Sequence, residues 1–156
     1  MKIKFSCLEP GDKVWVVYNK HYLERNGYFA FDNVERVLEC ATVLKNELEK
    51  REIYSSDYYD DYSYTVEEMN LKINTRFGEY KRRYSDFEDN KGQMTVTPDI
   101  YDNYPYLEVF SIKEAAIKYI ELINMRDINR LKEEIKNREY QIQLCEQSII
   151  DAKKLE

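Results

Sequence analysis

The chain has 156 residues, of which 43% are hydrophobic and 35% are charged, and its formal net charge is −6. This length fits one domain with an appended element, and the composition allows a packed core with large solvated faces. The chain holds no apolar run of about 18 residues, and its opening segment lacks the apolar stretch of a signal peptide, so we expect a cytoplasmic protein without a membrane span.

The amino-terminal third predicts strands followed by a helix. Residues 14–18 are β-branched and aromatic, as in a buried strand. The pair Asn26-Gly27 favours a type I′ turn, so a hairpin is expected around it. The apolar spacing then becomes helical, which predicts an amphipathic helix over about 33–52, with Asp32 as N-cap and Glu35 completing a capping box. Its apolar stripe consists of Val34, Val37, Leu38, Ala41, Leu44 and Leu48.

The middle third predicts further strands between two acidic loops. Residues 54–64 and 84–104 are rich in Asp, Glu and Tyr and have no apolar period, which favours loops. Short runs of alternating or β-branched residues predict strands at 66–74, 80–84, 94–97 and 106–110.

Residues 111–156 contain neither Gly nor Pro, which predicts one long helix over about 111–154. Its first part carries an apolar stripe that should pack on the sheet, formed by Ile112, Ala115, Ala116, Tyr119, Ile120 and Ile123. The expected fold class is therefore α+β, with a small antiparallel β-sheet or partial barrel, one amphipathic helix and a long carboxy-terminal helix.

Beyond residue 123 the apolar stripe narrows to a seam with the period of a coiled coil. The candidate oligomerisation residues are Ile128, Leu131, Ile135, Ile142 and Ile149, of which the four isoleucines recur every seven residues. Arg138 and Cys145 at the intervening positions argue against a strong zipper. The seam could be covered by a second copy, by the helix at 33–52 or by a target protein. We expect residues 1–123 to form an α+β domain and 124–156 a protruding, coiled-coil-like extension.

The net charge is confined to the middle third of the chain. Residues 1–53 carry nine basic and nine acidic side chains, and residues 111–156 also carry nine of each. Residues 54–110 carry six basic and twelve acidic side chains, which accounts for the whole charge of −6. A concentrated acidic field with aromatic rings in it attracts cationic surfaces and repels phosphate.

These acidic and aromatic side chains are the candidate partner-binding surface, because Tyr supplies contact area while carboxylates pair with Lys and Arg. The predicted binding residues are Asp57, Tyr58, Tyr59, Asp60, Asp61, Tyr62, Asp86, Glu88, Asp89, Asp99 and Asp102. A partner with a basic groove is typically a nucleic-acid-binding protein, and carboxylates that occupy its groove act as a DNA mimic.

No motif predicts catalysis. The single histidine, His21, has no acid or nucleophile placed beside it, and the four glycines are too scattered for a phosphate-binding loop. The three widely spaced cysteines predict neither a disulfide framework nor a zinc site and are expected to be small buried thiols. We therefore predict a protein that is not an enzyme and has no cofactor and no metal site.

Two alternative functions remain open. The chain could be a structural or assembly protein that forms a dimer through the terminal helix. It could also be a nucleic-acid-binding module, because Lys81, Arg82 and Arg83 lie between Tyr80 and Tyr84, and basic and aromatic side chains together hold phosphates and bases. Direct nucleic-acid binding is the weaker alternative, since three cations are flanked by acidic segments.

Residues 10–17, Pro-Gly-Asp-Lys-Val-Trp-Val-Val, and residues 109–115, Val-Phe-Ser-Ile-Lys-Glu-Ala, resemble short proteins of phages and mobile elements in low-GC bacteria. The resemblance implies a small β-sheet or barrel closed by a carboxy-terminal helix. In size and acidity the chain is similar to anti-CRISPR proteins, which are phage-encoded inhibitors of host defence nucleases. This similarity implies an inhibitor that acts in the host cytoplasm on a CRISPR effector nuclease.

Overall fold

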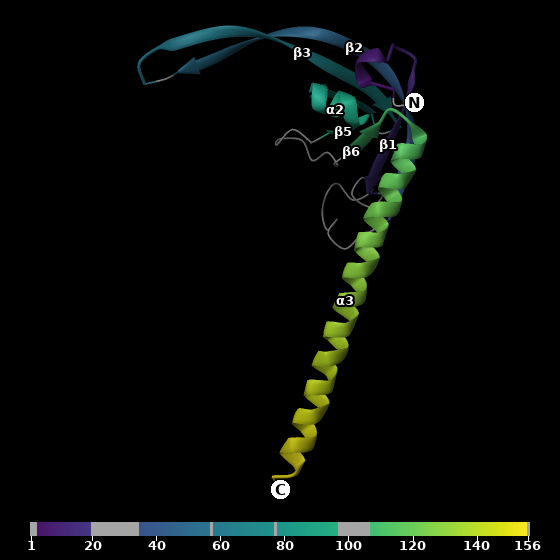
Figure 1. Cartoon of the computed structure of the whole chain (residues 1–156). Coiled ribbons are helices and arrows are strands. Elements are labelled where there is room, and N and C mark those ends of the chain that lie inside the picture. Colours follow the sequence, from purple (N-terminus) through teal and green to yellow (C-terminus); the bar gives the residue numbers. More distant parts are fainter. Residues whose placement is uncertain (1–2, 20–34, 57, 77, 97–106, 156) are drawn as a thin grey trace. The chain divides into compact units, whose positions relative to one another are not determined.

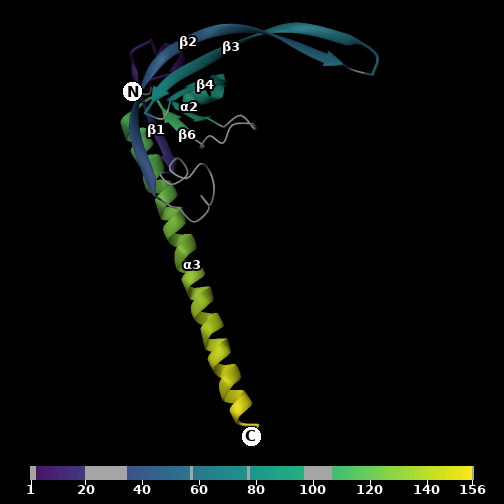
Figure 2. The same cartoon turned by 180° about the vertical axis from the view of Figure 1, so that it is seen from behind.

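The computed structural model describes residues 3–19, 35–56, 58–76, 78–96 and 107–155. The chain divides into two compact units, Met1–Ile120 and Glu121–Glu156. The first unit is an open, six-stranded antiparallel sheet in the order β4-β3-β2-β1-β6-β5, shown from two sides in Figures 1 and 2. The elements are η1 (Phe5–Cys7), β1 (Lys13–Asn19), β2 (Arg36–Ser56), β3 (Asp61–Thr75), β4 (Gly78–Tyr84), α2 (Asp86–Lys91), β5 (Gln93–Val96), β6 (Leu107–Phe110) and α3 (Lys113–Lys153).

The α+β class is confirmed, as are most of the predicted elements. The strands expected at 14–18, 66–74, 80–84, 94–97 and 106–110 correspond to β1, β3, β4, β5 and β6, and the terminal helix is α3. The expected hairpin at Asn26-Gly27, the N-cap Asp32 and His21 lie outside the described residues. No helix in the described part of the chain is long and apolar enough to cross a membrane.

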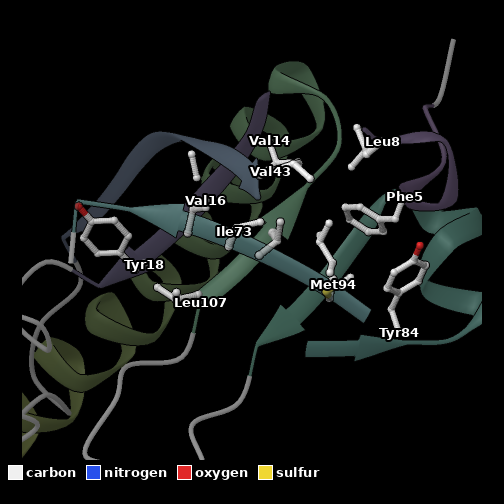
Figure 3. Close-up of a cluster of buried hydrophobic side chains, with 13 residues drawn as sticks. Phe5, Leu8, Val14, Val16, Tyr18, Val43, Ile73, Tyr84, Met94 and Leu107 are labelled. Atoms are coloured by element: carbon white, nitrogen blue, oxygen red, sulfur yellow. The ribbon is translucent and has the colours of Figure 1, made fainter. Parts of the chain in front are cut away.

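The main core lies on one face of the sheet, where side chains from all six strands and from η1 converge (Figure 3). In β1, Val14, Val16 and Tyr18 point into this core, because successive side chains of a strand alternate between its two faces. The core residues are Phe5, Leu8, Val14, Val16, Tyr18, Ala41, Val43, Leu71, Ile73, Tyr84, Met94, Leu107 and Val109.

The first turns of α3 cover the opposite face of the sheet. Val17 and Phe110 pack there against Ala116, which is fully buried. The Phe110 and Tyr119 rings lie 5.1 Å apart between their centroids. The predicted stripe of α3 therefore does pack on the sheet, through Ala115, Ala116, Tyr119 and Ile120.

The predicted helix over 33–52 is wrong, because residues 36–56 form β2. Two features of β2 imitate a helical period. Its inner end is covered on both faces, so that Val37 and Ala41 pack in the main core while Leu38 packs on the α3 side. An irregularity in the pairing with β3 between Val43 and Lys45 then shifts the alternation of side chains.

The two predicted loops are also largely wrong. Most of 54–64 belongs to β2 and β3, which pair as far as Ser56 and Asp61. The segment 84–104 contains α2 and β5. Ser85 and Glu88 form a capping box at the start of α2, and Gly92 ends it with a φ of 65°. A Cβ at Gly92 would lie 2.7 Å from the Ser111 hydroxyl oxygen, so this position requires glycine.

Candidate functional site

The most prominent feature of the first unit is a two-stranded ribbon that extends beyond the rest of the sheet (Figures 1 and 2). We call residues 47–68 the arm; it comprises the outer parts of β2 and β3 and their connection. At roughly 3.3 Å per residue, its strands run for about 30 Å. The neighbouring strands stop before the arm, since β1 pairs with β2 only over residues 36–42 and β4 begins to pair with β3 at Met69. In the described residues the two arm strands pair only with each other.

The arm contributes nothing to the core. The buried residues of β2 end at Val43 and those of β3 begin at Asn70, so every described side chain of the arm is exposed or half-buried. We call residues 54–64 the tip of the arm. Among the described residues, the tip carries the most exposed aromatic side chains, with Tyr58 at 94% and Tyr59 at 87% exposure and ring centroids 5.4 Å apart. Next to them, the Tyr62 and Tyr64 rings stack with centroids 6.0 Å apart.

The arm also concentrates the charge of the chain. Residues 47–68 hold eight carboxylates and two basic side chains, so their formal charge is −6, equal to that of the whole protein. One structural element therefore carries a formal charge equal to that of the whole chain. Its bounds differ from those of the acidic segment found in the sequence, because seven of the twelve carboxylates of residues 54–110 lie outside the arm and three arm carboxylates precede residue 54.

Carboxylates at the base of the arm are ion-paired, whereas the described carboxylates at the tip, Asp60 and Asp61, are not. Glu49 pairs with Lys81 at 2.9 Å, and Glu68 contacts Arg51 at 3.3 Å. At the tip, no ion pair among the described residues involves Asp60 or Asp61. The unneutralised charge therefore lies beside the exposed tyrosines.

One tyrosine of the arm is oriented by a carboxylate. The Tyr54 hydroxyl donates a 2.6 Å hydrogen bond to Glu52, two residues earlier on the same face of β2. This hydrogen bond favours the neutral phenol and raises the pKa of Tyr54. Ser55, Ser56, Asp61, Tyr62 and Ser63 line an open hollow with Tyr54 at the tip.

Three other predicted binding residues lie in α2, and two of them make structural contacts. Glu88 completes the capping box and pairs with Arg82 at 2.6 Å. Asp89 is buried and accepts two 2.8 Å hydrogen bonds from Ser6, one from the backbone amide and one from the hydroxyl. These contacts tie α2 to the amino-terminal segment. Asp86 is exposed in the first turn of α2.

A polar network anchors the base of the arm to the core. The Asn46 amide donates to the backbone oxygens of Phe5 at 2.6 Å and Leu8 at 2.9 Å, and its side-chain oxygen accepts a 2.9 Å bond from the Tyr84 hydroxyl. Burial raises the pKa of Tyr84 to about 12. Burial also raises the pKa of Tyr18 to about 12, partly offset by the charge of Arg76.

The basic cluster of β4 does not form one patch. Arg82 points to the core side of the sheet, in register with Leu71, while Lys81 and Arg83 point to the other side. Each cation contacts a carboxylate: Lys81 contacts Glu49, Arg82 contacts Glu88 and Arg83 contacts Glu68. The local ion-pair network leaves this strand with little free positive charge for phosphates.

Asp57, Asp99 and Asp102 lie outside the described residues. Of the remaining residues of the predicted site, the structure brings together Tyr58, Tyr59, Asp60, Asp61 and Tyr62 on the arm. The described residues contain no group of His, Cys, Asp or Glu side chains arranged to hold a metal ion. Cys7, Cys40 and Cys145 are exposed, so the expectation of buried thiols is wrong.

Sequence reasoning missed the contribution of residues 47–53 to the site because it assigned them to a helix. The alternation of Tyr62, Tyr64 and Val66 with Ser63 and Thr65 is typical of a strand, and it could have revealed the outer part of β3.

The fold and site together define an α+β protein with an exposed acidic-aromatic β-ribbon. Comparison of the chain with protein-family models, with curated proteins and with solved structures gave no match.

Proposed function

We propose that this chain is a non-enzymatic binding protein whose arm occupies a basic groove of a nucleic-acid-handling protein. The observation that carries the proposal is the coincidence of the whole formal charge of −6 with one projecting ribbon. A charge concentrated on an exposed element attracts a partner surface of opposite charge and steers association.

The tip has the side chains of a protein-binding site. Tyr58 and Tyr59 are almost fully exposed in the free protein, and aromatic side chains in the centre of an interface commonly supply most of its binding energy. Asp60 and Asp61 lie beside them and have no ion-pair partner among the described residues. Lys and Arg of a partner would therefore displace only water from these carboxylates. They would not have to break an existing salt bridge.

A partner whose basic groove normally holds phosphates would lose access to nucleic acid when the arm fills the groove. This consequence agrees with an inhibitor or adaptor that acts as a DNA mimic. A phage-encoded inhibitor of a CRISPR effector nuclease is the member of this class to which the chain is similar in size and acidity.

The test compares two variants that each remove three negative charges. The tip variant carries Asp57→Asn, Asp60→Asn and Asp61→Asn. The control carries Glu114→Gln, Glu121→Gln and Glu133→Gln, which are exposed carboxylates of α3. Proteins captured from a low-GC bacterial lysate by the wild-type chain are identified and purified. Their affinity for each variant is then measured as a function of salt, with and without competing duplex DNA.

We expect the tip variant to bind at least about tenfold more weakly with a flatter salt dependence. The control should match the wild-type chain, and duplex DNA should displace the wild-type chain from the partner. Equal affinity and salt dependence in the wild-type chain and the tip variant would contradict the proposal. Binding that persists at saturating DNA would contradict the DNA-mimic part of it.

A further inference from the structure

The second unit, residues 121–156, presents apolar side chains along one side of a helix. We call Ile128, Leu131, Ile135, Ile142 and Ile149 the α3 seam; their exposures range from 38% to 57%. No described residue of this unit is buried. A long helix in water is stabilised chiefly by burial of such a stripe against another element, so the pattern of the seam calls for an element that covers it.

The charged residues of this unit fall into two groups. The intrahelical ion pairs join Arg130 to Asp127 and Glu134, Lys136 to Glu133, and Lys154 to Asp151. Four other charged residues in or beside the seam take no part in them: within the described residues, no ion pair involves Lys132, Arg138, Glu139 or Glu146. These four side chains are available to a helix that covers the seam.

We propose that α3 pairs with α3 of a second copy of this chain in an antiparallel coiled coil over residues 128–152. In this register Ile128 faces Ala152 of the second copy, and Leu131 faces its Ile149. Ile135 then faces Cys145 of the second copy, and Arg138 faces its Ile142. Each layer of the coiled coil therefore pairs two side chains of different types. The register is symmetric, as a two-fold dimer requires.

The charges in and beside the seam select this orientation. In a parallel pair in register, Arg138 would lie against Arg138 and Glu134 against Glu139 on both sides, which places like charges together at the seam. In the antiparallel pair, Lys132 lies opposite Glu146 of the second copy at two symmetric places. Arg138 lies beside Glu139 of the second copy, so the two arginines neutralise the pair of Glu139 side chains that meet at the centre.

Crosslinking measures the orientation directly. The chain with Cys7→Ser and Cys40→Ser retains Cys145 alone, and a second chain adds Ile135→Cys. A short bis-maleimide should link the thiol introduced at position 135 of one copy to Cys145 of another, which mass spectrometry of mixed isotope-labelled copies identifies. Cys145 should not link to Cys145, because the two lie about 15 Å apart along the axis at 1.5 Å per residue. A Cys145–Cys145 link in the first chain would overturn the antiparallel arrangement.

A charge exchange tests the same arrangement without touching the seam. Lys132→Glu alone and Glu146→Lys alone should each raise the dimer dissociation constant about 3- to 10-fold in sedimentation experiments, because each creates two like-charge pairs. The double variant should return to within about twofold of the wild-type value. Failure of the double variant to recover, or a wild-type chain that stays monomeric at high concentration, would overturn the proposal. Neither exchange alters the arm.

Discussion

The arm and the second unit, residues 121–156, both expose apolar side chains, but they differ in charge and in chemistry. The arm has a formal charge of −6 over residues 47–68 and is rich in tyrosine. Residues 121–156 hold seven basic and eight acidic side chains, and their apolar groups are mostly aliphatic. Two copies of the arm repel each other, whereas two copies of the helix do not.

This difference indicates which surface accepts which partner. A highly charged surface with exposed aromatic rings favours a foreign partner of opposite charge. A nearly neutral surface with a regular aliphatic seam favours a copy of itself. We therefore expect recognition and self-association to reside on two different elements, and the following predictions test that separation.

Removal of the arm should have the largest effect. A chain in which a short Gly-rich turn joins Glu49 directly to Glu68 should lose partner binding completely. Its free energy of unfolding should change by less than about 1 kcal/mol, because no described arm residue is buried and exposed ion pairs contribute little. Denaturant unfolding and binding measurements check both parts. Partner binding by the shortened chain would contradict the assignment of recognition to the arm.

Charges in the α3 seam should have the next largest effect. Ile135→Lys with Ile142→Lys should raise the dimer dissociation constant by roughly 100-fold or more, because the dimer would bury four unpaired ammonium groups. Asn129→Lys with Asn137→Lys adds the same charge on the other side of the helix and should leave the dimer intact. Analytical ultracentrifugation measures the dimer, and arm-dependent binding should persist in both variants. Loss of that binding together with the dimer would show that the two surfaces are not separate.

Alkaline pH should unfold the core to which both surfaces are attached. Tyr18 and Tyr84 have pKa values of about 12 in the folded protein and near 10 when unfolded. The unfolded state therefore loses these protons first, and stability that is present below pH 10 falls as the pH rises from about 10 to 12. The loss should be roughly 2–3 kcal/mol for each tyrosine.

Circular dichroism and tyrosinate absorbance at increasing pH measure this loss. Tyr18→Phe and Tyr84→Phe should each flatten the pH dependence of the unfolding free energy, because each removes one titrating group. The same change at the exposed Tyr140 serves as the control. An equally steep dependence in the Tyr84→Phe chain would contradict the assignment.

Replacement of the aromatic pair at the tip should have the smallest of these effects. Tyr58→Ser with Tyr59→Ser should weaken partner binding about tenfold and leave the melting temperature unchanged, since both rings are exposed. Tyr140→Ser removes an exposed ring from α3 and should not change partner binding. Calorimetric titration and thermal unfolding distinguish the two outcomes. A lower melting temperature in the tip variant would assign the rings a structural role.

Local sequence signals were enough to predict a helix or strand where a single pattern of residues determines the secondary structure. Uninterrupted helix formers without Gly or Pro predicted α3, and β-branched or alternating runs predicted β1, β3, β4, β5 and β6. They failed in β2, where coverage of both faces and a shift of register produce helix-like spacing. They also failed in α2, where the Ser85–Glu88 capping box lies within a short acidic segment.

The order of residues alone sets the net charge of the protein, the position of tyrosines beside its carboxylates, and the seven-residue period of α3, because none of these depends on folding. Which carboxylates are available to a partner depends on the folded chain. Asp89 is buried against Ser6, Glu88 pairs with Arg82, and Glu49 pairs with Lys81, in each case across a long separation in the chain or between neighbouring elements. Asp60 and Asp61 have no ion-pair partner among the described residues, because β1 and β4 stop before the end of the arm, and the pairing of strands is a property of the folded sheet.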